Sequence, residues 1–379
     1  MPLAVAIVGN SAFSMIKFRG EMISFLVGKG DQVFCFAPDY DDEARGAVQL
    51  LGGTPVDFTL NRSTLSVFDA MASVQHLRRK LRQYGVDLVF CYFLKPIIVA
   101  NLAARLAGVK SVFSMIEGRG IIFSDAARPT LKLRLLKLVM TMMLGFTLRM
   151  SQRVFVLNRE DLHFARRLLG GKADHTVHVN GIGLDTDYYA PLDDHRRAIR
   201  FIFCGRLLRS KGIVEFVEAA RALKPVHTEV EFTVIGDVDE NADSLSREQM
   251  LDWSRQGHID WVGFQADTRP FFHRRTVLVL PTYYPEGLPR SIQEALSMAC
   301  PVITTSAPGC GEQIEEGVTG FVVESRKARA LTEKMRHFAE NPHAIITMGD
   351  AARRYAVTHF RSEMINQTIF AETDPAERG

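Results

Sequence analysis

The feature that most constrains this chain is a regular alternation of short apolar runs and helical stretches, typical of a parallel β-sheet with crossover helices. The alternation restarts near residue 200, so it predicts two doubly wound α/β domains. Strands are expected at residues 4–8, 32–37, 54–58, 88–92, 111–115 and 153–156, and then at 200–204, 231–235, 258–262, 277–281, 301–304 and 320–323. Helices are expected at residues 19–27, 70–84, 97–106 and 213–223.

A chain of 379 residues suits two such domains better than a single core. Residues 180–194 are rich in Gly, Asp and Pro and form the expected linker. We therefore place the domains at residues 1–185 and 186–379, leaving open whether the last helix packs back on the first domain. Ligands of doubly wound sheets bind at the carboxyl ends of the strands, so we expect the two domains to face a ligand-binding cleft.

Composition argues against several classes of protein. A net charge of +3 gives no global basic field for nucleic acid. The five cysteines include no CxxC pair, which predicts reduced core thiols in a cytosolic protein. The first residues lack a basic segment and resemble a buried strand rather than a signal peptide. No uncharged apolar run reaches the roughly 18 residues of a membrane-spanning helix.

Two carboxylates lie where an apolar strand ends and a helix opens. Glu286 falls in a loop rich in Pro and Gly after the strand, and Glu294 follows eight residues later, inside the helix that begins near Arg290. The backbone at a helix start favours phosphate, and a carboxylate can accept hydrogen bonds from two sugar hydroxyls. The alternative for each glutamate taken singly is an ordinary solvated charge.

Two further strand ends carry candidate binding groups. Arg206 and Lys211 follow the strand at residues 200–204 and can neutralise a diphosphate, although a solvent-facing cluster is the alternative. The backbone near Val262 and Phe264 can read the edge of a base, whereas the aromatic side chains there also suit a core. The glycines of residues 307–312 and 316–321 allow close approach of the backbone.

These pieces, in this order and spacing, resemble the C-terminal half of a family 4 retaining glycosyltransferase with the GT-B fold, in which two doubly wound Rossmann-like domains face a central cleft. The resemblance is strong over residues 150–325. It implies that Arg206 and Lys211 bind the donor diphosphate, that Glu294 holds the ribose hydroxyls, and that the anomeric configuration is retained without a metal or other cofactor. It also assigns the donor sugar and phosphate to Glu286 and to the backbone of Gly287, Leu288 and Pro289.

The first half resembles a subgroup that builds bacterial surface glycans on a polyprenyl-diphosphate carrier, through Phe18-Arg19, residues 116–120 and the segment around Asn158. Many family members place a histidine near the catalytic centre, but residues 111–125 contain none, and Glu117 is the nearest ionisable residue. The catalytic candidates are therefore Glu286, Arg206, Lys211 and Glu117. The candidates for binding the acceptor are Asn10, Lys17, Arg19 and Glu117. An ordinary helix start with exposed bases is the alternative for Lys17 and Arg19.

Residues 128–153 are strongly apolar and basic, with Arg128, Lys132, Arg134 and Lys137 and no acidic residue. Such a helix suits an anionic membrane surface, and a buried crossover helix with basic residues reaching solvent is the alternative. Asp237-Val-Asp239 has the spacing of a metal-binding pair, but a surface loop after a strand is the preferred interpretation. The eleven histidines show no metal-ligand spacing.

We therefore predict a cytoplasmic enzyme on the inner face of the cytoplasmic membrane. It would move a hexose or N-acetylhexosamine from a nucleotide-diphosphate sugar, which we expect to be a UDP-sugar, to a polyprenyl-diphosphate-linked or other glycan acceptor in cell-surface polysaccharide synthesis. Two alternatives stay open: a non-catalytic scaffold that binds sugar nucleotides, and a nucleotide-sugar epimerase on the same fold.

Overall fold

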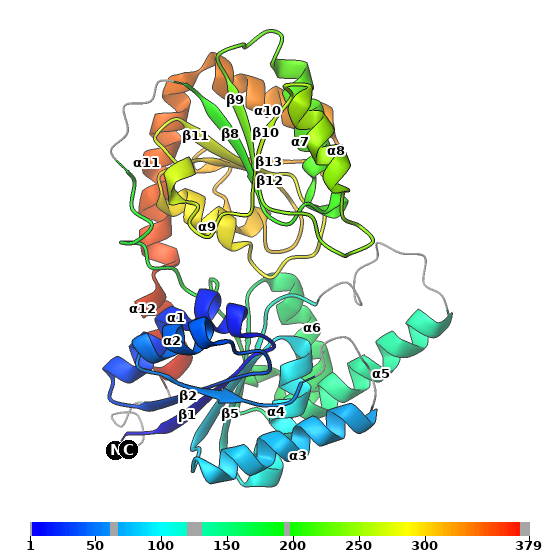
Figure 1. Ribbon diagram of the computed structural model, residues 1–379, viewed down its shortest axis with the longest axis vertical. Helices are drawn as coiled ribbons and strands as arrows, with labels where there is room; N and C mark the ends of the chain where they lie inside the picture. Colours follow the sequence, from blue (N-terminus) through cyan, green and yellow to red (C-terminus); the bar gives the residue numbers. More distant parts are fainter. Residues whose placement is uncertain (1, 61–66, 120–130, 193–197, 372–379) are drawn as a thin grey trace. The chain divides into compact units, whose positions relative to one another are not determined.

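The structure is a computed structural model that describes residues 2–60, 67–119, 131–192 and 198–371 (Figure 1). The chain divides into two compact units. The first comprises Met1–Gly183 and Ser362–Gly379, and the second comprises Leu184–Arg361. Each unit contains one parallel sheet with its crossover helices, as the alternating pattern predicts. No helix in the described ranges is long and apolar enough to span a bilayer.

The sheet of the first unit has seven strands in the order β3-β2-β1-β4-β5-β6-β7. Its strands are β1 (Ala4–Val8), β2 (Gln32–Ala37), β3 (Thr54–Asp57), β4 (Leu88–Tyr92), β5 (Ser111–Ile116), β6 (Arg153–Val156) and β7 (Thr176–His178). The six predicted strands of this half are confirmed to within one residue at each end. The seventh, β7, is three residues long and has no apolar run that would have marked it.

Six crossover helices connect these strands: α1 (Ala12–Gly28), α2 (Asp42–Leu50), α3 (Val67–Gln83), α4 (Leu94–Ala107), α5 (Leu131–Leu148) and α6 (Arg159–Leu169). Helices α3 to α6 pack on one another in succession, whereas α1 packs on α2 and on the last helix of the chain. The two groups cover opposite faces of the sheet, which is the doubly wound arrangement (Figure 1).

Helix α1 begins at Ala12 and not near residue 19, where we expected it. The Ser11 hydroxyl accepts a hydrogen bond from the amide of Ser14 at 3.2 Å, which caps the helix. The Asp39 carboxylate, which follows β2, accepts from the amide of Ala12 at 2.7 Å. Lys17 and Arg19 therefore lie inside the helix instead of in the loop before it.

The sheet of the second unit has six strands in the order β10-β9-β8-β11-β12-β13. They are β8 (Arg200–Cys204), β9 (Glu231–Ile235), β10 (Asp260–Gly263), β11 (Thr276–Leu280), β12 (Val302–Thr305) and β13 (Gly320–Val323). The helices are α7 (Ile213–Leu223), α8 (Arg247–Arg255), α9 (Arg290–Ser297), α10 (Ala328–Glu340) and α11 (Pro342–His359). All six predicted strands are confirmed: β8, β9 and β13 have the expected bounds, and β10, β11 and β12 are shifted by one or two residues.

The last helix, α12 (Ser362–Phe370), packs back on the first unit, as the expected boundaries left open, so the second unit ends at Arg361 instead of residue 379. The reason is the apolar face of α12. The Phe370 ring is buried, with its centroid 6.4 Å from that of Phe25, 6.0 Å from that of Phe90 and 6.2 Å from that of Phe113. The observed boundary between the units lies at residues 183 and 184, two residues before the expected one.

Candidate active site

The topology of the second sheet selects one place for a ligand. From β8 the chain builds outward to β9 and β10, and it then returns to add β11 on the other side of β8. The loops after β8 and β11 therefore leave the sheet in opposite directions, and ligands of doubly wound sheets bind at the carboxyl ends of such a strand pair. The first loop carries Arg206 and Lys211, and the second carries Glu286.

The two loops are joined by an ion pair between the Lys211 ammonium and the Glu286 carboxylate. Their side chains are only 11% and 13% exposed, so the pair is largely shielded from water. The Ser210 carbonyl also accepts hydrogen bonds from the amides of Tyr283 and Tyr284, at 2.8 and 3.1 Å. These bonds hold the loops together and fix the position of both charged side chains.

Two glycines allow the loops to approach this closely. Gly212 has a φ of +82°, and a Cβ there would collide with the carbonyl group of Pro281. Gly309 has a φ of +75°, and a Cβ there would collide with the carbonyl oxygen of Gly287. Because L-residues rarely adopt this conformation and have no space here, both positions require glycine.

Arg206 lies at the more exposed side of the same loops. Its guanidinium lies 5.9 Å from the centroid of the Tyr284 ring, and the Lys211 ammonium lies 5.8 Å from that same centroid. An Asp239 oxygen lies 3.3 Å from the Arg206 guanidinium, and Asp237 pairs with Arg247 at 2.9 Å. Both members of the Asp237-Val-Asp239 motif therefore face arginine side chains.

Glu294 is buried in α9, where two donors orient its carboxylate. Arg290 Nε donates to Oε1 at 3.1 Å, and the Thr268 hydroxyl donates to Oε2 at 3.2 Å. Burial, and then the charge of Glu294, raise the pKa of the Tyr189 phenol, which is part of the same network. Sequence reasoning missed Tyr189 and Thr268, because both are distant from Glu294 in sequence.

The start of α9 points to the same edge of the sheet. Pro289 precedes this helix and has no side-chain acceptor with which to cap it, so the start of α9 suits the oxygens of a phosphate. Gly287 and Leu288 are half-buried in the loop before it. The predicted residues Arg206, Lys211, Glu286 and Glu294 thus all lie on the loops and helix that follow β8 and β11.

Val262 and Phe264 lie at the end of β10, the outer strand of the sheet. The Val262 carbonyl accepts a hydrogen bond from Gln265 Nε2 at 2.7 Å, so this carbonyl already has a donor. The Phe264 side chain is 60% exposed, so it is not a core residue.

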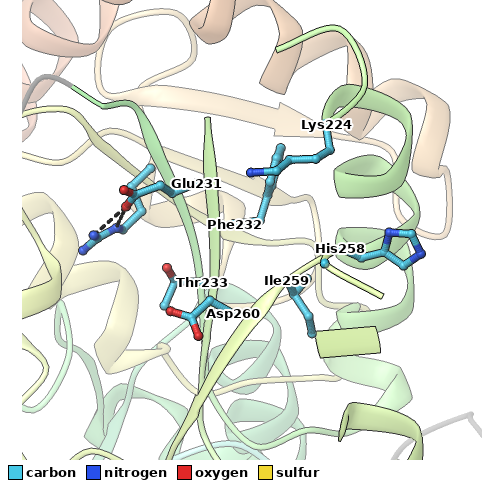
Figure 2. A pocket seen from close by; sticks show the side chains of 9 residues that line it. Lys224, Glu231, Phe232, Thr233, His258, Ile259 and Asp260 are labelled. Atoms are coloured by element: carbon cyan, nitrogen blue, oxygen red, sulfur yellow. Dashed lines mark hydrogen bonds and ion pairs between the residues drawn. The ribbon is translucent and has the colours of Figure 1, made fainter. Parts of the chain in front are cut away.

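A hollow of about 360 Å³ lies in the same unit, at the starts of β8, β9 and β10 (Figure 2). Arg200 there donates to Glu231 at 2.7 Å, and the Lys224 ammonium donates to the Val230 carbonyl at 2.9 Å. Arg200 and Lys224 therefore already have partners within the protein. The hollow lies at the amino ends of the strands. It therefore lies at the opposite edge of the sheet from the loops after β8 and β11.

In the first unit, our expectation that Arg19 binds the acceptor is wrong. Its side chain is completely buried and forms an ion pair with Glu117, the residue after β5. Its guanidinium lies 4.1 Å from the centroid of the Tyr92 ring, and one of its nitrogens donates to the Phe18 carbonyl at 2.8 Å. A group sealed in this way is not accessible to the diphosphate of an acceptor. Arg19 instead links α1 to the ends of β4 and β5.

Asn10 remains at the carboxyl end of β1, where we expected it. Its side-chain carbonyl accepts from the Ser14 hydroxyl at 3.2 Å, and that hydroxyl lies 3.2 Å from the hydroxyl of Tyr92. Lys17 is half-buried in α1. The sequence did not indicate Ser14 or Tyr92, which complete this polar group.

The Asn158 segment caps helix α6. The Asn158 side chain accepts from the amide of Asp161 at 2.7 Å and donates to its carboxylate at 2.9 Å. Arg119 Nε lies 3.1 Å from the same carboxylate. Burial raises the pKa of Asp161 to about 6, although Arg119 and Asn158 oppose the shift.

Comparison with known proteins fits this geometry. The family described as "Glycosyl transferase 4-like domain" matches residues 17–181, and the family described as "Glycosyl transferases group 1" matches residues 194–355. Together they cover most of both units. The chain is a family 4 glycosyltransferase with the GT-B fold.

Relatives of this glycosyltransferase include an N,N'-diacetylbacillosaminyl-diphospho-undecaprenol alpha-1,3-N-acetylgalactosaminyltransferase of Campylobacter jejuni, 22% identical over 94% of this chain and 95% of the relative. An Escherichia coli UDP-Gal:alpha-D-GlcNAc-diphosphoundecaprenol alpha-1,3-galactosyltransferase is 26% identical over 69% of this chain and 68% of its own. The Anabaena protein HepE, solved in complex with UDP, has a TM-score of 0.76 at 18% identity, over 98% of this chain and 99% of its own.

We predict that the Lys211–Glu286 pair is energetically coupled. Lys211→Met leaves a shielded carboxylate without its partner and should cost roughly 3 kcal/mol of unfolding free energy. Adding Glu286→Gln should recover at least 1 kcal/mol of that loss, because the unpaired charge is then gone. Chemical denaturation of the two single variants and the double variant measures the coupling. Purely additive effects would contradict the pairing.

The raised pKa of Asp161 predicts a pH dependence of stability. A carboxyl group whose pKa is raised by folding binds its proton more tightly in the folded state, so it costs stability as pH rises from about 4 to about 6. Asp161→Asn does not titrate, and relative to the unmodified glycosyltransferase it should gain roughly 1–3 kcal/mol over that range. The difference between the two proteins in melting temperature, measured from pH 4 to 7, checks this. A constant difference would be inconsistent with the shift.

Proposed function

We propose that this enzyme is a retaining, metal-independent glycosyltransferase that uses a UDP-hexose or UDP-N-acetylhexosamine as donor. The proposed acceptor is a polyprenyl-diphosphate-linked sugar in cell-surface polysaccharide synthesis. The observation that carries the proposal is the shielded Lys211–Glu286 pair, held between the loops after β8 and β11 with Arg206 beside it.

The chemistry of these residues fits the departure of a nucleoside diphosphate. Lys211 and Arg206 supply two positive charges next to one another, which stabilise the negative charge that develops on the leaving diphosphate. The start of α9 supplies backbone amides to the same phosphate. Two cations and a helix start can together do the work that a metal ion does in other phosphate sites.

The two glutamates would bind different parts of the donor. Arg290 and Thr268 hold the Glu294 carboxylate in place, so it can accept hydrogen bonds from the ribose hydroxyls. Glu286 lies at the ammonium of Lys211 and can accept from a hydroxyl of the donor sugar. The lysine has three N–H donors, so it can hold Glu286 and a phosphate oxygen together.

The relatives support the choice of substrates. Both named enzymes act, by their names, on sugars linked to undecaprenol through a diphosphate, and both form alpha-1,3 linkages. One name specifies UDP-Gal as the donor, and HepE was solved with UDP. The charged loops of this chain suit the same kind of donor.

Binding of nucleotides tests the donor proposal. A ligand present at about 100 times its dissociation constant stabilises a protein by about 2.7 kcal/mol, which a thermal melt detects. UDP should raise the melting temperature, whereas ADP, GDP and NAD should not. Lys211→Met should lose both the UDP shift and sugar transfer, while Leu50→Ala, on exposed helix α2, should keep both. A normal UDP shift or normal turnover in Lys211→Met would refute the assignment.

We also propose that α5 rests on an anionic membrane surface. One face of this helix is buried against α4 and α6, through Met140, Leu144 and Leu148. Another face exposes a row of large apolar side chains at helical spacing: Leu131, Leu135, Leu138, Val139, Met142 and Phe146. Arg134 and Arg149 are also exposed. Arg128 lies outside the described residues, as does the side chain of Lys132.

This combination supports peripheral attachment on the cytoplasmic side of the membrane, where a lipid-linked acceptor would be reached. An exposed apolar row is costly in water, and a membrane interface would cover it. The basic residues would add attraction to anionic lipid. The exposed apolar row argues against the alternative of an ordinary crossover helix, because a crossover helix needs apolar side chains only on the face that packs against the sheet.

Vesicle sedimentation tests the attachment. The unmodified enzyme should sediment with vesicles that contain anionic phospholipid, and the bound fraction should fall in high salt. The double variant Leu135→Glu, Met142→Glu should reduce the bound fraction at least about fivefold, because it places two charges in the apolar row. Leu50→Glu, on an exposed position of α2, is the matched control. Equal sedimentation of all three proteins would exclude α5 as the contact.

A further inference from the structure

Phe93 has a backbone conformation that a phenylalanine rarely adopts. It follows β4 directly, and its φ of 66° and ψ of 148° lie in a region used almost only by glycine. Among the described residues of the first unit, it is the single non-glycine residue with a positive φ. Such strain persists only where the surrounding structure holds it, and it is typical of functional sites.

The neighbouring residue, Tyr92, shows how the strain is held. Tyr92 is fully buried, and its ring lies under the Arg19 guanidinium at 4.1 Å. Its hydroxyl lies 3.2 Å from the Ser14 hydroxyl, and a Cβ at Gly9 would collide with it. With Tyr92 fixed from these directions, Phe93 is left half-buried at the carboxyl end of the strand, its ring centroid 5.0 Å from that of Tyr92.

A second aromatic side chain lies at the same edge of the sheet. Phe13, in the first turn of α1, is 58% exposed, and its ring meets that of Phe18 at an angle of 83°. Phe13 immediately precedes Ser14, which contacts Tyr92, and Phe93 immediately follows Tyr92. Because β1 and β4 are adjacent strands, the first turn of α1, which carries Phe13, and Phe93 both follow neighbouring strand ends.

Neither phenylalanine has an evident role in the core. Glycine would adopt the conformation of Phe93 without strain, and Phe13 buries less than half of its surface. A half-buried polar side chain, that of Asn10, lies at the same edge of the sheet, and its carbonyl accepts from the buried hydroxyl of Ser14. Aromatic faces beside a few fixed polar groups are typical of binding sites for small molecules.

We infer that Phe13 and Phe93 form a stacking surface for a pyranose ring of the acceptor. The apolar C–H face of a pyranose would lie on the aromatic rings, while its hydroxyls would reach the side chain of Asn10. The inference rests on the proposed function and adds to it the part of the acceptor that the first unit recognises. This surface would recognise the sugar of the acceptor, and not its diphosphate or its lipid.

Two soluble probes separate these parts of the acceptor: a short-chain prenyl diphosphate that carries N-acetylglucosamine, and the same prenyl diphosphate without a sugar. Calorimetric titration should show that Phe13→Ala and Phe93→Gly weaken binding of the first probe at least about tenfold and leave binding of the second unchanged. Phe13→Tyr keeps an aromatic face and should bind nearly as the unmodified enzyme does. Leu50→Ala is the control for an exposed apolar side chain.

The melting temperature provides an independent readout. Phe93→Gly removes strain and should melt at the same temperature as the unmodified protein or higher, although it binds the sugar probe more weakly. A lower melting temperature with unchanged binding would show a purely structural role and overturn the inference. Equal losses for both probes would do the same.

The outcome is distinguishable from that of the proposed donor site. Failure of UDP to stabilise the protein, with selective loss of the sugar probe in the variants, would reject the donor assignment and leave the stacking surface standing. A normal UDP shift together with no binding of the sugar probe by the unmodified enzyme would reject the stacking surface alone.

Discussion

The common direction of all strands within each sheet is the constraint on which both units depend. Parallel strands deliver every carboxyl end to the same edge, so the loops that follow them are neighbours however far apart they lie in sequence. In the second unit this constraint brings together Lys211 and Glu286, which are 75 positions apart in the sequence. In the first unit it brings Asn10 near Tyr92.

Each unit contains a shielded ion pair at this edge, and the two pairs differ in what they can do. The Arg19 side chain is fully buried against Tyr92, so its pair with Glu117 fixes one strand end relative to another. Lys211 and Glu286 retain some exposure, and a half-exposed arginine, Arg206, lies near the same tyrosine ring as Lys211. Similar charge chemistry therefore holds the fold together in one unit and suits a ligand in the other.

Much of the fold could be predicted from the sequence, because a strand buried on both faces is a continuous apolar run. The start of α1 could not, since its position depends on a bond from its first amide to Asp39, which follows a different strand. The burial of Arg19 depends on Glu117, about 100 residues away, and no local pattern reports it. The short strand β7 has no run long enough to detect.

Some residues of the candidate site could also be predicted from the sequence, and others could not. Arg206, Lys211, Glu286 and Glu294 were predictable, because each directly follows an apolar strand or opens the helix after one. The residues that orient them, such as Thr268 and Tyr189, come from other loops and carry no recognisable spacing. The strain at Phe93 is a property of the backbone, so the sequence contains no sign of it.

The position of α12 has a consequence for how the protein is made. The Phe370 ring fills a space among Phe25, Phe90 and Phe113, in the core of the unit that the ribosome synthesises first. That unit cannot complete its packing until the whole of the second unit, Leu184–Arg361, has been translated. The usual order, in which the N-terminal domain of a growing chain completes its folding first, therefore does not apply to this unit. Until α12 is added, the first unit leaves exposed the apolar surface that the Phe370 ring later covers, and chaperones would have to protect that surface.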